Sequence, residues 1–359
     1  MTNLVKSFRK LLAASVFVSV SVFSASAFAE VPKVTASIKP IHSWVATVME
    51  GVGTPELIVK GTGSEHGYSL RPSDADNLAK ADIVFWAGPS METFLIKPLD
   101  NLAEKADKVA LSEIPGIKLI DMREGGMFEA HSHDHDHDHE HEHGEADHDH
   151  DKAEKADAHD HDHAHDHDHA HEHANEHESA EADHDHDHHK DLHFWLDPEN
   201  AKVAVKDIAE VLAKKDPEHA DRYRQNATAY VAKLDTLIKQ VNSELAPVRG
   251  KPFIVFHDGY HYFEKRFDIP AAGSITVNPE QAPGAQRISE IKEKVKDLKS
   301  ACIFSEPQFE PRVVKTIQEG TGVKTGELDP LGYDIPEGPM QYELMIEKIA
   351  HSLKHCLSE

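Results

Sequence analysis

Histidine is the residue type that sets this chain apart, and its distribution divides the sequence into two parts. Of the 30 histidines, 22 lie between His131 and His189, where they alternate with aspartate and glutamate. Imidazole and carboxylate groups bind divalent metals, so such tracts are typical of metal binding. The other eight histidines lie in segments with apolar patterning, and they are His42, His66, His193, His219, His257, His261, His351 and His355.

The tract itself cannot bury enough apolar surface to offset the entropy cost of ordering its backbone. We therefore expect a disordered loop over residues 129–190. A precise metal site needs ordered groups behind its ligands, so the main site should use the isolated histidines instead. An acidic solubilising loop is the alternative for the tract. As accessory weak metal ligands we expect, among others, His131, His133, His135, His137, His139, His161, His163, His165, His167 and His169.

The N-terminus has the pattern of a secretory signal. Lys6, Arg9 and Lys10 precede an apolar run over 11–28, and Ala27-Phe28-Ala29 matches a cleavage site. We predict that residues 1–29 are removed on export and that the mature protein is soluble. An uncleaved anchor is the alternative, but serines dilute the run and it falls short of the ~20 apolar residues that span a bilayer.

Charge and cysteine content are compatible with an exported protein. The formal net charge is −26, and most of this negative charge lies in the tract. The sequence has no stripe of basic residues that would indicate a nucleic-acid partner. Cys302 and Cys356 are the only cysteines, with no Cys-x-x-Cys spacing. In an oxidising compartment they can pair, and closing that loop would stabilise the fold by roughly 4 kcal/mol. Two unpaired buried thiols are the alternative.

Outside the tract, short β-type runs alternate with helical runs, which is typical of an α/β protein with parallel sheets. No phosphate-binding glycine motif is present, so a nucleotide ligand is not expected. Strands are predicted at residues 33–38, 56–60, 82–86, 108–111 and 117–120, and again at 252–256, 272–277, 301–305 and 323–328.

One helical pattern is unusually long. Apolar residues recur at helical spacing over residues 218–245, and such a helix would extend ~42 Å. We predict two α/β lobes, each with a mostly parallel sheet flanked by helices, joined by this rigid helix. The expected boundaries are a signal at 1–29, an N-terminal lobe at 30–216 that contains the loop, the connecting helix at 217–247, and a C-terminal lobe at 248–359.

Four predicted segments bring ligand-type side chains to the place where a bound ion would lie. Three of them follow the carboxyl ends of strands, where α/β proteins bind their ligands. His257 follows the strand at 252–256, and Asp329 follows the strand at 323–328. Glu65 and His66 lie in a glycine-rich loop beyond the strand that ends at residue 60, and His193 precedes a helix.

Each isolated histidine also has a structural interpretation. His42 lies on the apolar face of the first helix, where a core role is the better interpretation. His261 is expected on the helix after His257, outside the metal site. His219, His351 and His355 have the positions of helix-surface residues. Asp329 precedes a proline and can simply begin a turn.

Four motifs then make a resemblance specific: GSEHGY at 63–68 with PSD at 72–74, HFWLDP at 193–198, FHDGY at 256–260 and LDPLG at 328–332. Their order and spacing resemble those of the periplasmic metal-binding proteins of zinc and manganese ABC importers. The acidic histidine loop and the C-terminal cysteine pair resemble the zinc-uptake members of Gram-negative bacteria. The resemblance implies a periplasmic location and two α/β lobes joined by one long helix, with the metal between them.

The resemblance implies His66, His193 and His257 as metal ligands, with a carboxylate or water completing the set. Manganese-type relatives carry glutamate at the third position, where this chain has His257. Three imidazoles favour Zn²⁺ over Mn²⁺. Glu65 and Asp329 are both candidates for the fourth ligand, and we favour Glu65. Asp329 can instead help to position the ligands without contacting the metal itself.

The expected function is therefore capture of Zn²⁺ for a membrane permease of an ABC importer, by a monomer without enzymatic activity. An accessory periplasmic zinc protein is a further candidate partner. The alternatives are a manganese importer subunit, a periplasmic zinc storage or buffer protein, and a zinc hydrolase, since three histidines and a water also describe hydrolytic zinc sites.

Overall fold

The computed structural model describes residues 30–123, 128, 190–276, 278–298 and 302–358. The predicted signal at 1–29 and residues 129–189 of the predicted loop lie outside this range, and so do all ten accessory histidines named above. The expectations for them stay predictions. At the end of the predicted loop, Lys190 is part of a short strand, because that residue pairs with Asp121 across the base of the tract.

The N-terminal lobe is built on four parallel strands in the order β2-β1-β3-β4. Every residue of β1 and β3 is buried, as expected for a parallel sheet covered on its faces. The strands are β1 (Val34–Ala36), β2 (Glu56–Leu57), β3 (Ile83–Trp86) and β4 (Asp107–Ala110), and the helices of this lobe are α1 (Lys39–Val48), α2 (Pro72–Lys80) and α3 (Thr93–Leu102).

The C-terminal lobe repeats this plan with four parallel strands in the order β10-β9-β7-β8. A small apolar core that includes Ile254, Ile291 and Val314 fills the space between this sheet and its helices. The strands are β7 (Phe253–His257), β8 (Gly273–Thr276), β9 (Cys302–Ser305) and β10 (Lys324–Glu327), and the helices are α6 (His261–Phe267), α7 (Ala285–Asp297) and α8 (Arg312–Thr321).

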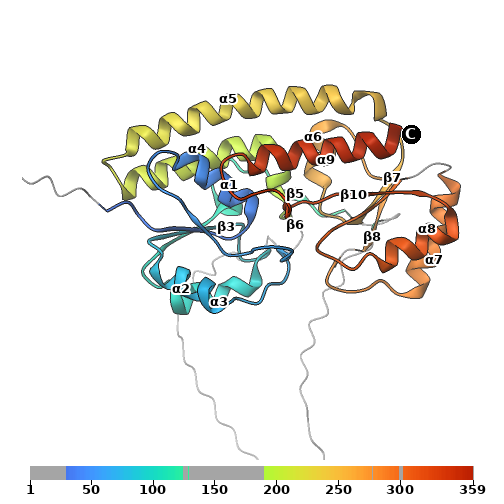
Figure 1. The fold of residues 1–359 in the computed structure, drawn as a ribbon, viewed down its shortest axis with the longest axis horizontal. Coiled ribbons are helices and arrows are strands. Elements are labelled where there is room, and N and C mark those ends of the chain that lie inside the picture. The colour runs from blue at the N-terminus through green and yellow to red at the C-terminus, as the bar shows by residue number, and fades with distance from the viewer. Residues whose placement is uncertain (1–29, 124–127, 129–189, 277, 299–301, 359) are drawn as a thin grey trace, which may run out of the picture.

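One long helix, preceded by a shorter one, connects the lobes. Asp197 caps α4 (Pro198–Lys215) by accepting a hydrogen bond from the Glu199 amide, and Pro198 occupies the first helical position. The next helix, α5 (Ala220–Leu245), buries one face through Tyr223, Tyr230 and other apolar residues. Figure 1 shows α5 extending over both lobes. The predicted long connecting helix is thus present, and the two-lobe α/β fold is confirmed.

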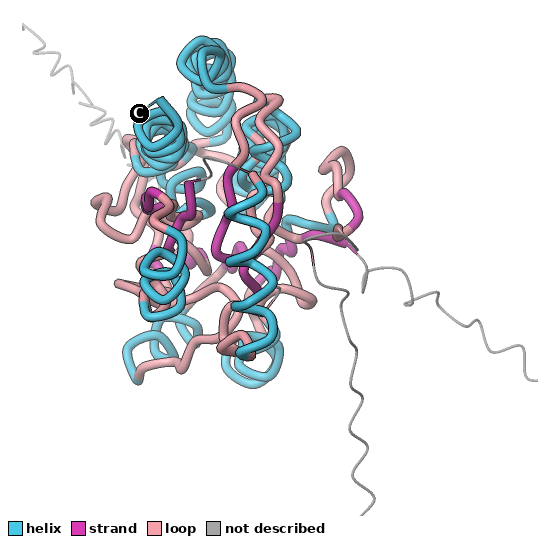
Figure 2. Tube along the Cα trace, turned by 90° about the vertical axis from the view of Figure 1, so that its right-hand side faces the viewer, coloured by secondary structure: helices cyan, strands magenta, loops and turns pink. Residues whose placement is uncertain are grey.

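The last helix, α9 (Gln341–Ser358), lies alongside α5 and also contacts α1. Figure 2 shows these helices at one side of the strands, with α9 viewed nearly end-on at the C-terminus. One continuous apolar core contains residues of both lobes, from Val34 to Leu357. Because the lobes share this core, large relative motions would expose much apolar surface to water.

Two long-range links tie the final segment of the chain to the rest. The buried Lys39 ammonium at the start of α1 donates hydrogen bonds to the backbone carbonyls of Gly332, Tyr333 and Ile335. A disulfide joins Cys302 of β9 to Cys356 of α9, with the Cα atoms 6.2 Å apart. The predicted pairing is therefore present, and the alternative of two free thiols is wrong.

One local expectation differs from the structure. The run at 117–120 does not join a parallel sheet; instead β5 (Ile120–Asp121) pairs antiparallel with β6 (Lys190–Asp191), which brings the two ends of the tract together. Helix α2 begins at Pro72, and the Asp74 carboxylate in its first turn accepts a hydrogen bond from the Arg71 amide. Among the described residues, no helix combines the length and the apolarity needed to cross a membrane.

Candidate metal centre

Four side chains from distant parts of the chain converge on one point. The ligand atoms of Glu65, His66, His193 and His257 all lie within 4.8 Å of one another. The Nε2 atom of His193 lies 3.3 Å from that of His66 and 3.2 Å from that of His257. Tetrahedral zinc with bonds of 2.0–2.1 Å places its ligand atoms ~3.3 Å apart. The spacing of the imidazoles therefore fits a single zinc ion.

The segments that carry these residues come from both lobes. Glu65 and His66 lie in the loop between β2 and α2 of the N-terminal lobe. His193 lies directly before the short 3₁₀ turn Phe194–Leu196 that leads into α4. His257 is the last residue of β7 in the C-terminal lobe, where it pairs with Thr276 of β8. Strand β7 thus ends at His257, one residue later than the sequence pattern predicts.

Two buried carboxylates hold two of the imidazoles in place. The Nδ1 atom of His193 lies 2.8 Å from an Asp191 oxygen, and that of His257 lies 2.7 Å from a Glu306 oxygen. Both carboxylates are at least 95 % buried. When each Nδ1–H donates to its carboxylate, each Nε2 keeps a lone pair directed into the cluster, and the carboxylate raises the basicity of that nitrogen.

The electrostatic environment differs among the three imidazoles. Burial, together with neighbouring histidines, lowers the pKa of both His66 and His193 well below the usual value. Burial also acts to lower the pKa of His257, but the charge and hydrogen bond of Glu306 outweigh it and raise the pKa to about 9. Two of the imidazoles are therefore neutral near pH 7, whereas the third would have to lose a proton before it could bind a metal.

Glu65 completes the cluster on one side. Its Oε1 lies 3.8 Å from Nε2 of His193 and 4.0 Å from Nε2 of His66. This oxygen is buried without a hydrogen-bond partner, and burial raises the pKa of the carboxyl to about 7. A buried oxygen without a partner is costly unless a ligand satisfies it. The donor set of three nitrogens and one oxygen fits a divalent metal.

Gly259 leaves space for the cluster. A Cβ atom built at this position would lie 2.4 Å from Nε2 of His257 and 3.1 Å from Cδ2 of His193. Any side chain there would displace an imidazole. This steric need accounts for the glycine in the FHDGY motif.

Asp329 has its own local role. Its Oδ1 accepts hydrogen bonds from the amides of Leu331 and Gly332, and its Oδ2 accepts one from Tyr333. Gln308 also donates to Oδ1. The carboxylate thus organises the turn that follows β10, and it is not in the group of ligand atoms described above.

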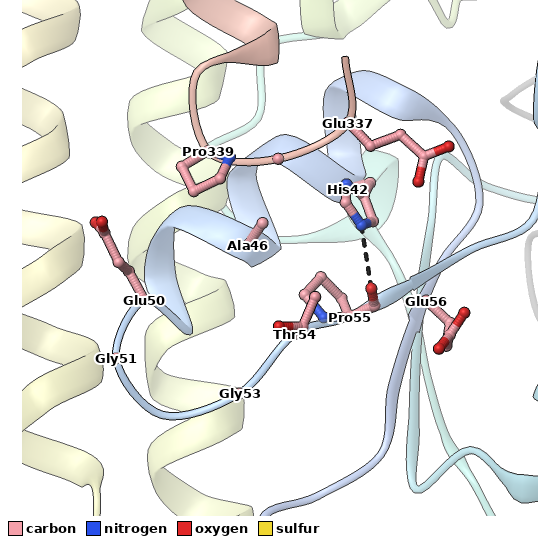
Figure 3. A pocket seen from close by; sticks show the side chains of 11 residues that line it. His42, Ala46, Glu50, Gly51, Gly53, Thr54, Pro55, Glu56, Glu337 and Pro339 are labelled. Atoms are coloured by element: carbon pink, nitrogen blue, oxygen red, sulfur yellow. Dashed lines mark hydrogen bonds between the residues drawn. The ribbon is translucent and has the colours of Figure 1, made fainter.

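His42 is buried, as the sequence pattern predicts for a core residue. Its Nε2 lies 3.1 Å from the carbonyl oxygen of Pro55, which can only accept. Figure 3 shows the ring between Glu337 and Pro55 in a pocket of about 420 Å³. His42 is not one of the residues of the metal cluster.

The remaining isolated histidines also lie elsewhere. His219 precedes α5, with Nδ1 2.8 Å from an Asp216 oxygen. His261 begins α6 and is partly buried. His351 and His355 are exposed on α9, as the helical pattern predicts.

Asp191 and Glu306 are the functional residues that sequence reasoning missed. Asp191 precedes His193 by two residues at the end of the tract, where it is easily taken for another acidic tract residue. Glu306 directly follows β9, and so it obeys the same rule that singled out Asp329, a carboxylate just beyond a parallel strand.

Two α/β lobes with a shared long helix, and imidazoles gathered from both lobes, define a solute-binding protein whose ligand is a metal ion. The chain belongs to the family described as zinc-uptake complex component A, periplasmic, whose model matches residues 34–356.

Individual relatives agree with the family match. The chain is 56% identical over 326 residues to the high-affinity zinc uptake system protein ZnuA of Brucella suis, covering 91% of this chain and 92% of that protein. The protein of the same name from Yersinia pestis is 33% identical over 324 residues, covering 90% and 91%.

Solved structures support the fold. A zinc-bound deletion mutant of ZnuA superposes with a TM-score of 0.66 at 20% identity, covering 92% of this chain and 99% of that one. FpvC of Pseudomonas aeruginosa in complex with Mn²⁺ superposes with a TM-score of 0.65 at 16% identity, covering 91% and 98%.

Proposed function

We propose that this protein captures one Zn²⁺ ion with His66, His193 and His257, with Glu65 as the fourth and weaker ligand, and delivers it to the membrane permease of an ABC importer. The observation that supports this most directly is the spacing of the three Nε2 atoms, at 3.2 and 3.3 Å across both lobes. Relatives that align over about nine-tenths of the chain are named as zinc uptake proteins.

The donor set favours zinc over manganese. Imidazole nitrogen suits Zn²⁺, whereas carboxylate and water suit Mn²⁺. The cluster offers three nitrogens and one carboxylate. Tetrahedral geometry is also the common choice of zinc, and the ~3.3 Å separation of its ligand atoms matches the observed spacing.

The fold supports release by a small rearrangement. The continuous core that joins the lobes, together with α5, limits the motion to slight opening or closure. We propose that the protein acts as a monomer in the periplasm, after removal of residues 1–29, and that an accessory periplasmic zinc protein is a further partner. Asp329 would then act by shaping the turn beside the site.

The deciding experiment counts zinc on the metal-free protein and measures affinity by competition with a chelator. Alanine at His66, His193 or His257 should each abolish tight binding of one ion. His219→Gln is the matched control, because His219 bonds Asp216 outside the cluster. Tight zinc that persists in all three alanine variants would overturn the proposal.

The same measurements separate the rival functions. A storage protein would keep most of its zinc capacity in the three alanine variants, because the tract would hold it. Removal of residues 131–189 should leave one tight site, and loss of tight binding would assign the main site to the tract. A hydrolase would cleave esters or amides in the zinc-loaded state, whereas we expect no turnover.

A further inference from the structure

Outside the main cluster, a second group of histidine and carboxylate side chains lies on the outer surface where α5 and α9 pack together. His351 and His355 are four residues apart on α9, so they share one face of the helix. Their rings are nearly parallel, with an interplanar angle of 4° and centroids 6.3 Å apart. A carboxylate from the neighbouring helix, that of Glu244 on α5, lies 3.5 Å from Nδ1 of His351.

The dimensions of this group can be compared with those of the main cluster. There, the centroids of His66 and His193 are 5.3 Å apart while their Nε2 atoms are 3.3 Å apart. The centroids of His351 and His355 are only about 1 Å further apart. The His351 side chain is 75 % exposed, so a rotation of its ring would meet little steric resistance. The contact between Glu244 and His351 is already close to the ~3.3 Å edge of a zinc tetrahedron.

We propose that His351, His355 and Glu244 form a second and weaker Zn²⁺ site that fastens the end of α5 to α9. Two histidines at this helical spacing are a known zinc-binding arrangement. Glu347, one turn before His351 and also beside the groove between the helices, supplies additional negative charge. The site shares no residue with the main cluster.

Lys354 competes with zinc for Glu244. Its ammonium lies 3.7 Å from the same carboxylate oxygen that contacts His351. Lys348, the other cation beside the groove, donates hydrogen bonds to Asp334 instead. The exposed ligands and this competing lysine predict an affinity below that of the buried main site, so the second site fills only when free zinc is more abundant.

The test measures amide hydrogen exchange of the full chain at buffered free zinc, because buffering removes the effect of zinc taken up by the tract. Zinc should slow exchange in peptides from 238–248 and 344–358 of the wild type, at concentrations above those that fill the main site. The double variant His351→Ala/His355→Ala should lose this slowing. Lys354→Gln should show it at lower zinc, because the competing ammonium is gone.

Two controls isolate the second site from the main one. His193→Ala disrupts the main cluster and should keep the zinc-dependent slowing on α9, whereas His219→Gln, near the far end of α5, should behave as the wild type. Equal exchange rates of the double variant and the metal-free wild type without zinc would show that α9 is intact. Absence of slowing in the wild type, or equal slowing in the double variant, would overturn the proposal while leaving the main site untouched.

Discussion

Both carboxylate oxygens of Glu306 lie against one nitrogen of His257, at 2.7 and 2.9 Å from Nδ1. Glu306 directly follows β9 and His257 ends β7, and these two strands are neighbours in the sheet. The sheet therefore aligns a carboxylate with an imidazole whose Nε2 lies 3.2 Å from that of His193. Glu306 therefore controls the protonation of His257, one of the proposed zinc ligands.

Glu306→Gln should weaken zinc binding and reduce the number of protons released. The amide keeps the shape and can still accept from Nδ1–H, but it lacks the charge that raises the pKa of His257 to about 9. We expect affinity to fall by about 10-fold or more. Calorimetry in buffers of different ionisation enthalpy measures the protons released. Glu310→Gln, at an exposed position, is the control, and an unchanged proton count in Glu306→Gln would contradict the assignment.

Zinc affinity should rise with pH between about 6.5 and 9. In the metal-free protein the His257 imidazole is protonated below pH 9, and it must lose that proton to bind zinc. The slope should approach one decade of affinity per pH unit. Below about pH 7 the profile should steepen, because the Glu65 carboxyl, with its pKa raised by burial to about 7, then also holds a proton. Chelator competition across this range measures the profile, and a flat result would remove His257 from the ligand set.

Gly259→Ala should damage zinc binding without unfolding the protein. The added Cβ would lie 2.4 Å from Nε2 of His257, so the ring must turn away from the ion. We expect a loss of roughly 10–100-fold in affinity, as when ligand orientation is disturbed. Gly284→Ala is the matched control, since a Cβ there meets no atom within 4 Å. Wild-type affinity in Gly259→Ala, with normal circular dichroism, would contradict the geometry.

Lys39→Met should lower the free energy of unfolding by about 3 kcal/mol, because three carbonyls would lose a charged hydrogen-bond donor in a buried position. The carbonyls belong to Gly332, Tyr333 and Ile335. Urea unfolding of the metal-free protein measures the loss. Lys80→Met, which removes an exposed lysine paired with Asp76, should change stability little. Equal effects of the two substitutions would mean that the buried contacts contribute no more than a surface ion pair.

The double substitution Cys302→Ala/Cys356→Ala should lower the free energy of unfolding by roughly 4 kcal/mol, because the disulfide closes a long loop. Zinc affinity should stay as in the wild type, since neither sulfur belongs to the metal cluster. Unfolding with and without reductant provides the comparison: reductant should destabilise the wild type only. A large loss of affinity in the double variant would show that the disulfide also shapes the site.

Features that depend on local pattern along the chain could be predicted from the sequence alone. Alternating apolar runs predicted the two α/β halves, and helical spacing from Tyr223 to Val241 predicted the long helix, because each depends only on neighbours along the chain. His66, His193 and His257 were singled out because their motifs are local too.

The groups that surround those histidines became evident only in the folded structure. It placed Glu65 in the cluster and engaged Asp329 in its own turn, and it brought Glu306 against His257. It also paired residues 120–121 with 190–191 rather than with the main sheet. These outcomes depend on strand order and on packing between segments up to hundreds of residues apart. Such contacts are set by the shape of the folded core, and no local pattern of residues encodes them.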